Sequence, residues 1–178
     1  ISEMINDFSK EIQGMAKTPA AEHLFMVNEK AKKLNEKLST EFHNMVARGL
    51  FICKRARPDI QTAEAFLTTR VKGPDVDDWK KLIRMLKYLK GTKDLVLTLK
   101  ADDANIVKWY IDAAFTVHGD MRGHTGATMS MGTGSIISTS TKQKMNTRSS
   151  TESELVGTDD VLPAILWTRL FLKAQGYN

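Results

Sequence analysis

The chain has 178 residues and a formal net charge of +5 at pH 7, and 42% of its residues are hydrophobic and 26% charged. A chain of this size and composition buries a core, so intrinsic disorder and collagen-like repetition are excluded. The single cysteine, Cys53, excludes an intramolecular disulfide and a cysteine-built zinc site. The mild basic excess is compatible with a phosphate-rich partner but does not identify one.

The sequence shows no sign of a membrane span or of secretion. Its apolar runs are shorter than the roughly 20 residues that a membrane-spanning helix needs. The first residues, Ile1-Ser2-Glu3-Met4, show neither an initiator methionine nor a signal-peptide pattern. We therefore expect an intracellular protein, cytoplasmic or nuclear, that is cut from a longer precursor.

Residues 1–105 are expected to form one mostly helical region. The sequence predicts a short helix within residues 3–12 and a longer one over residues 39–55, where apolar residues recur at helical spacing. Cys53 lies in this longer helix and is expected to be a buried, inert thiol. The predicted inward positions are Phe42, Met45, Val46, Leu50 and Cys53.

The segment Arg57-Pro58-Asp59 separates this helix from the next. Pro58 suits a first helical turn, because an N–H group there would have no intrahelical partner. Gly73-Pro74 should end the new helix. Its predicted buried positions are Ile60, Ala63, Phe66 and Leu67.

A third helix is predicted after Asp75, which is a suitable N-cap, and it should end near Gly91. Asp77 and Asp78 lie where the helix dipole favours acidic side chains. The predicted inward stripe consists of Trp79, Leu82, Ile83, Leu86 and Leu89. The opposite face is basic and carries Lys80, Lys81, Arg84, Lys87 and Lys90.

That basic face has two interpretations. A solvated surface is the usual explanation for a charged helix face. Contact with a nucleic-acid backbone is the alternative, because no acidic side chains are interleaved with the lysines and arginines on this face. The candidate phosphate contacts are Lys80, Arg84 and Lys87.

Residues 106–178 should form a second region, because glycine, serine, threonine and β-branched residues become frequent there. A short strand is predicted at residues 95–99, with a turn at 102–105. Three further strands, at residues 106–112, 126–131 and 135–141, predict an antiparallel meander.

A long helix is predicted to follow the meander. Ser149 and Glu152 have the spacing of a capping box, and Pro163 should kink or break the helix. The predicted inward stripe consists of Leu155, Leu162, Ile165, Leu166, Leu170 and Phe171. The expected fold class is therefore mixed α+β.

Asp112 and Glu154 are the residues whose positions suggest metal chemistry. Asp112 follows an apolar strand, and Glu154 lies in the first turns of the last helix. Carboxylates that converge from such elements hold Mg²⁺, and two such ions about 4 Å apart cleave phosphodiesters. From spacing alone, a turn former and a helix-dipole partner are the more ordinary explanations.

Several short strings in chain order carry a resemblance. Arg57-Pro58-Asp59-Ile60 and the segment from Trp79 to Thr92 resemble the "RPDI … W … L.YLKGT" signature of copia-type retrotransposon polyproteins. Residues 110–114 (YIDAA) resemble that family's "YSDADWAGD". Residues 130–132, 140–144 and 149–155 resemble its "F.LG", "SKKQ" and "SSTEAEY" strings.

The resemblance implies the end of a reverse transcriptase region followed by the first half of a ribonuclease H domain, a partial fold made of a three-stranded meander and a long helix. It implies that Asp112 and Glu154 are catalytic Mg²⁺ ligands, with Asp112 bridging two ions, and that the substrate is the RNA strand of an RNA–DNA hybrid. The remainder of the polyprotein would be a partner. Lys142, Lys144 and Arg148 become candidate phosphate contacts.

The chain also departs from the family pattern. The third and fourth acidic ligands and the polymerase aspartate pair have no counterpart among the 178 residues. The alternative interpretation is therefore a catalytically inactive fragment that acts as a binding or structural subunit. In either case the open edge of the sheet is a candidate surface for a protein partner. His118 and His124 fall in a glycine-rich turn, where exposure is expected.

Overall fold

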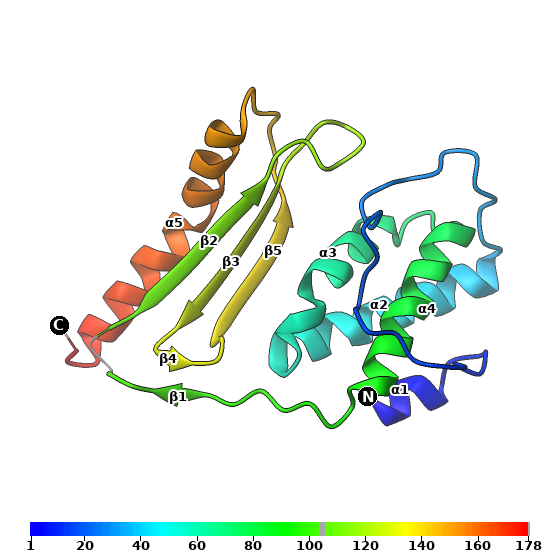
Figure 1. The fold of residues 1–178 in the computed structure, drawn as a ribbon, viewed down its shortest axis with the longest axis horizontal. Coiled ribbons are helices and arrows are strands. Elements are labelled where there is room, and N and C mark those ends of the chain that lie inside the picture. The colour runs from blue at the N-terminus through cyan, green and yellow to red at the C-terminus, as the bar shows by residue number, and fades with distance from the viewer. Residues whose placement is uncertain (104–105, 178) are drawn as a thin grey trace. The chain divides into compact units, whose positions relative to one another are not determined.

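The structure is a computed structural model that describes residues 1–103 and 106–177. The chain divides into two compact units, Ile1–Val96 and Leu97–Asn178. The first unit consists of helices, and the second contains antiparallel strands and one long helix (Figure 1), so the fold is of the mixed α+β class. Part of the turn predicted at 102–105, namely Ala104 and Asn105, lies outside the described residues.

The first unit begins with a helix shorter than predicted. Helix α1 spans only Ser2–Asn6. The chain leaves the helix because the backbone N–H and the hydroxyl of Ser9 both donate to the Glu41 carboxylate, each at 2.6 Å. Phe8 and Ile12 then enter the core of the unit from irregular backbone.

Helix α2 spans Glu36–Arg55 and starts three residues before the predicted position, because the side chain of Asn35 caps it by accepting from the Leu38 N–H. Cys53 is buried as expected, and burial is the main cause that raises the pKa of its thiol to about 11. Leu50 is 38% exposed, so its predicted burial is wrong. Gly49, not Leu50, turns toward α3 and meets the side chain of Glu64.

The prolines and caps of the next two helices lie where the sequence predicts. A short 3₁₀ turn, η1, spans Pro58–Ile60 and leads directly into α3, Gln61–Arg70. Helix α4 spans Val76–Gly91, and Asp75 and Asp78 form a reciprocal capping box at its start. Arg70 bridges the two carboxylates of that box, at 3.1 and 3.0 Å.

The core of the first unit contains all four residues predicted for the helix after Pro58. From α4 it takes Met85 in place of Ile83, which is only partly buried. Its buried helical side chains are Met4, Phe42, Met45, Val46, Cys53, Ile60, Ala63, Phe66, Leu67, Trp79, Leu82, Met85, Leu86 and Leu89.

The second unit contains the predicted three-stranded meander. Strands β2 (Lys108–Ala114), β3 (His124–Ser130) and β5 (Ile137–Lys142) pair antiparallel in the order β2-β3-β5. The two-residue strands β1 (Lys100–Ala101) and β4 (Gly132–Thr133) pair separately.

The strand predicted at residues 95–99 is not formed. Leu95, Val96 and Leu99 are 54%, 78% and 53% exposed, and strand pairing starts only at Lys100, opposite Thr133. An extended apolar run becomes a strand only where a partner strand accepts its backbone hydrogen bonds, and no described strand pairs with residues 95–99.

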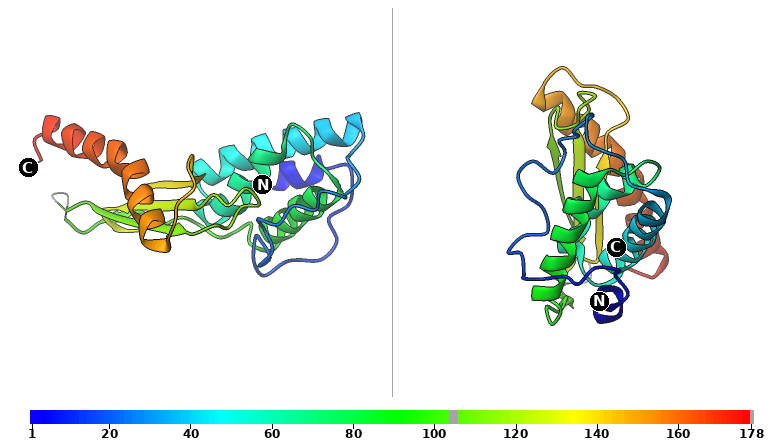
Figure 2. Two further views of the ribbon diagram at one scale, coloured as in Figure 1. Left: turned by 90° about the horizontal axis from the view of Figure 1, so that it is seen from above. Right: turned by 90° about the vertical axis from the view of Figure 1, so that its right-hand side faces the viewer.

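Helix α5 spans Ser150–Ala174. The Ser149 hydroxyl caps it by accepting from the Glu152 N–H, but the Glu152 carboxylate bonds to the N–H of Arg148 instead of that of Ser149, at 2.6 Å. The helix continues through Pro163 without a break, and its axis bends along its length (Figure 2).

The buried face of α5 differs from the predicted one. Its buried residues are Ser153, Gly157, Val161 and Thr168. A Cβ at Gly157 would lie 3.2 Å from the Cβ of Ala113, so small residues let the helix approach the sheet closely. The predicted inward stripe is therefore wrong, and only Ile165 of that set is partly buried. The others are exposed: Leu155 70%, Leu162 42%, Leu166 48%, Leu170 66% and Phe171 48%.

Within residues 1–103 and 106–177, no helix combines the length and the apolar character that crossing a bilayer requires.

Candidate functional site

Asp112 lies on the edge strand β2, where its register partner is Gly126. Successive side chains of a strand point to opposite faces of the sheet. Its neighbour Ala113 faces α5, because the Cβ of Ala113 lies against Gly157. Asp112 therefore projects from the face opposite α5, where it is exposed.

Glu154 lies at the start of α5 and is exposed. Asp160, six residues later, accepts a hydrogen bond from Thr125 of β3 at 3.2 Å. Six residues turn a helix by about 600°, so Glu154 and Asp160 lie on opposite flanks of the face that Gly157 centres. Glu154 is therefore on the flank of α5 opposite to Asp160.

The two carboxylates do not lie on one face of the sheet, because Asp112 projects from the face opposite α5 and Glu154 lies on α5 itself. Oxygen donors of this kind suit Mg²⁺. Two carboxylates that approach from different faces do not make a complete site, and the described residues contain no group of three or more metal-ligating side chains. Asp112 and Glu154 alone therefore do not fit a two-metal centre.

The candidate phosphate contacts of the first unit lie along one helix, α4, but differ in how far they are neutralised. Lys80 forms an ion pair with Asp77 at 2.9 Å. Arg84 donates to the hydroxyl of Thr18 at 2.9 Å. Lys87 is only partly exposed. The Lys80 side chain is nevertheless 71% exposed, so its ion pair lies at the surface.

The candidate phosphate contacts of the second unit lie at the end of β5 and before α5. Lys142 pairs with Asp120 at 2.7 Å. Lys144 and Arg148 are exposed in the connection between the two elements. Of these three candidates, only Lys142 forms an ion pair with a described residue.

His118 and His124 are buried, each only 7% exposed, so the predicted exposure is wrong. The turn folds back onto the sheet, and the Nε2 of His118 lies 3.1 Å from the Nδ1 of His124. The Nε2 of His124 lies 2.6 Å from the Oγ of Ser140 on β5. The spacing of the glycines predicted a turn here, but it did not indicate that the turn would pack on the sheet and bury the two histidines.

Burial and the neighbouring His118 lower the pKa of His124 to about 4. Burial is also the main cause that lowers the pKa of His118. A neutral imidazole has one N–H donor and one acceptor nitrogen, which suits a chain of hydrogen bonds. The arrangement is therefore explained as a buried polar network that holds the turn on the sheet.

Comparison with known proteins relates the chain to transposons. The chain is 26% identical, over 187 aligned positions that cover 100% of its length, to a retrovirus-related Pol polyprotein from transposon TNT 1-94 of Nicotiana tabacum. It is 31% identical, over 138 positions and 77% of its length, to a retrovirus-related Pol polyprotein from transposon RE2 of Arabidopsis thaliana.

The chain spans 14% and 9% of the lengths of these two relatives. No family model matches the chain, and no solved structure matches it. Its homologues are thus retrovirus-related Pol polyproteins of plant transposons, and it is similar to a short segment of each.

Proposed function

We propose that the chain is a fragment of a copia-type retrotransposon polyprotein. Residues 1–105 correspond to the end of the reverse transcriptase region, and residues 106–178 to the first half of a ribonuclease H domain. The observation that carries the proposal is the three-stranded antiparallel meander β2-β3-β5 followed by the long helix α5. The similarity to transposon Pol polyproteins supports it independently.

In the complete protein, Asp112 and Glu154 would be two of the carboxylates that hold Mg²⁺, and the rest of the polyprotein would supply the others. Mg²⁺ held there would supply activation of the attacking water and charge stabilisation of the leaving oxygen for cleavage of the RNA strand of an RNA–DNA hybrid. Strand β2 has only β3 as a partner among the described strands, so its other edge can accept a strand from the remainder of the polyprotein.

A second candidate function is a catalytically inactive fragment that binds nucleic acid or a protein partner. The observation that favours it is the placement of the two carboxylates on different faces, without a third metal-ligating side chain in the part of the chain that the structure describes. We therefore expect the 178 residues alone to show no ribonuclease H activity.

Cleavage of a labelled RNA–DNA hybrid in Mg²⁺ tests both candidates. The 178-residue chain is compared with the same chain extended through the coding sequence that follows. We expect only the extended protein to cleave, and we expect Asp112→Asn or Glu154→Gln to reduce its rate by about 100-fold or more. Asp159→Asn, an exposed acid of the same helix, is the matched control and should leave the rate unchanged.

Two outcomes would contradict these proposals. Cleavage by the 178 residues alone, abolished by Asp112→Asn, would contradict the inactive fragment. Full cleavage by the extended protein carrying Asp112→Asn would contradict the role proposed for Asp112.

The proposed phosphate contacts are tested by the salt dependence of hybrid binding. Each Lys or Arg that touches a phosphate contributes about one unit to the slope of log K against log salt. Lys144→Gln and Arg148→Gln should each lower the slope by about that amount. Lys80→Gln and Lys142→Gln should lower it less, because Asp77 and Asp120 already neutralise those lysines. Equal slopes for all four variants would contradict this assignment.

A further inference from the structure

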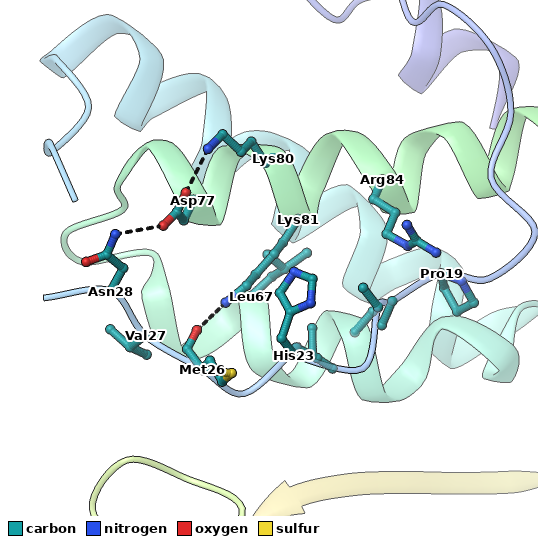
Figure 3. A pocket seen from close by; sticks show the side chains of 14 residues that line it. Pro19, His23, Met26, Val27, Asn28, Leu67, Asp77, Lys80, Lys81 and Arg84 are labelled. Atoms are coloured by element: carbon teal, nitrogen blue, oxygen red, sulfur yellow. Dashed lines mark hydrogen bonds and ion pairs between the residues drawn. The ribbon is translucent and has the colours of Figure 1, made fainter. Parts of the chain in front are cut away.

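In the first unit, the irregular segment 18–28 passes beside α3 and α4 and encloses a cavity of about 550 Å³ (Figure 3). This volume is in the range of about 300–1,000 Å³ that is typical of small-molecule sites. Most of the lining is apolar: Pro19, Ala20, Ala21, Leu24, Met26, Val27, Ala63 and Leu67. The wall formed by α4, in contrast, carries cationic side chains.

Lys81 is the first of these cations. Its ammonium group donates to the carbonyl oxygen of Met26 at 2.5 Å and lies 4.3 Å from the centre of the Phe66 ring. Among the described residues no carboxylate forms an ion pair with it. Burial is the main cause that lowers the pKa of Lys81, so its positive charge is held where water stabilises it poorly. An anion in the cavity would compensate for that lost hydration.

Arg84, one turn further along α4, is the second cation. One terminal nitrogen donates to Thr18, whereas Nε is shielded from water and has no hydrogen-bond partner in the described part of the chain. A buried donor without a partner is costly. The planar guanidinium matches the two oxygens of a carboxylate or phosphate group.

The third cation of the wall, Lys80, is already neutralised. Asp77 accepts from it at 2.9 Å and from Asn28 at 3.3 Å (Figure 3). The carboxylate of Asp77, at the edge of the cavity, is thus already bonded to Lys80 and Asn28. Lys81 and Arg84, in contrast, form no ion pair with a described carboxylate, although Asp75, Asp77 and Asp78 lie near enough to favour the charged form of Lys81.

We propose that this cavity binds a small organic anion, with one phosphate or carboxylate head against Lys81 and Arg84 and an apolar body against Leu24, Ala63 and Leu67. A nucleic-acid backbone is a poor match, because it would place a polyanion over a mainly apolar floor. This inference therefore assigns Arg84 to the cavity instead of to a nucleic-acid phosphate, and it does not depend on the proposed ribonuclease H function.

Titration of the full 178-residue chain with four probes tests the chemistry, with binding followed by amide signals in NMR. The probes are 1-naphthyl phosphate, 1-naphthoate, inorganic phosphate (head alone) and 1-naphthol (body alone). We expect the first two to bind at least about tenfold more tightly than either single-part probe, because only they satisfy both the cations and the apolar floor. The stronger of the two identifies the head group.

Variants then locate the site. Lys81→Met and Arg84→Met should each weaken binding of the stronger probe by about tenfold or more, and Ala21→Trp should block it by filling the cavity. Lys72→Met, an exposed lysine of the same unit outside the cavity, is the matched control and should have no effect. Thermal unfolding confirms that each variant is folded.

The proposal is overturned by absence of saturable binding, by equal affinity for inorganic phosphate and 1-naphthyl phosphate, or by a loss in Lys72→Met as large as that in Arg84→Met. If Arg84→Met does not fold, the binding measurement on Ala21→Trp tests the proposal instead. That variant keeps Lys81 and Arg84 and only fills the cavity.

Discussion

The guanidinium of Arg57 donates to both the carbonyl and the hydroxyl oxygen of Thr92, at 2.8 and 2.7 Å. The same guanidinium holds the Asp59 carboxylate, which also accepts from the Tyr88 hydroxyl at 2.7 Å. Arg57 and Asp59 belong to the segment 57–60 and Tyr88 and Thr92 to the segment 79–92, the two segments that resemble the copia-type signature. The two segments are therefore joined in space, and their side chains hold η1 to the end of α4.

Replacing Arg57 should strongly destabilise the first unit. Arg57 is 2% exposed, and lysine cannot reproduce its planar fork. We expect Arg57→Lys to lower the free energy of unfolding by about 3 kcal/mol. Urea unfolding, followed by NMR amide signals of the first unit, measures it. Arg55→Lys, on the exposed end of α2, is the control, and an equal effect of both changes would contradict the prediction.

The first unit should lose stability as the pH rises. The Glu64 carboxyl is fully buried, has no hydrogen-bond partner within the described residues and lies against Gly49, so burial raises its pKa from 4.5 to about 8. Between those pH values the folded state holds a proton that the unfolded state has released, and stability therefore falls as pH rises.

Glu64→Gln should remove most of this dependence, which amounts to a few kcal/mol. Urea unfolding of the first unit at pH 5, 7 and 9 tests it. Glu41→Gln, an acid of the same unit that is not fully buried, should leave the slope in place. A wild-type first unit equally stable at pH 5 and pH 9 would contradict the prediction.

The second unit should show the opposite dependence. His124 has a pKa of about 4 in the folded state, because of burial and the neighbouring His118, against an ordinary value of 6.5. Between these values the unfolded state binds a proton that the folded state does not, so stability falls as pH decreases. Urea unfolding followed by NMR signals of β3 at pH 7 and pH 5 measures it. His124→Gln should flatten the profile, whereas His43→Gln, in the other unit, should not.

Gln143 should be essential to the second unit. It is fully buried, and its amide donates to the hydroxyl of Thr125 and the carbonyl of Ser153 and accepts from the Ser153 hydroxyl, at 3.1, 2.9 and 3.0 Å. Gln143→Leu leaves buried polar groups without partners and should cost about 2–3 kcal/mol. Urea unfolding of the second unit measures the loss. The exposed Gln175→Leu is the control, and equal stability of the two variants would rule out this role.

Several elements could be predicted because their signals are local. The Asp75 N-cap, Pro58 at the start of η1, the Ser149 cap and the order of the three paired strands depend on residues near one another in the chain. Backbone geometry and the nearest polar groups fix such features.

Other features could not be predicted, because they depend on distant residues. Leu155 and Leu170 have helical spacing, yet Gly157 and Val161 are the residues that pack on the sheet. The periodicity of apolar residues predicts an apolar face of a helix, but it does not predict which surface that helix packs on. The cavity beside Lys81 was also missed, because segment 18–28, distant in sequence from α4, encloses it.

The sequence by itself determined the helices, the meander and the similarity to transposon polyproteins, because each depends on residue order and short-range geometry. Only the tertiary structure decided that Asp112 projects from the face of the sheet opposite the helix that carries Glu154, and that Lys81 and Arg84 line one cavity. The physical reason is that orientation and burial arise from close packing between segments far apart in the chain, which no local pattern specifies.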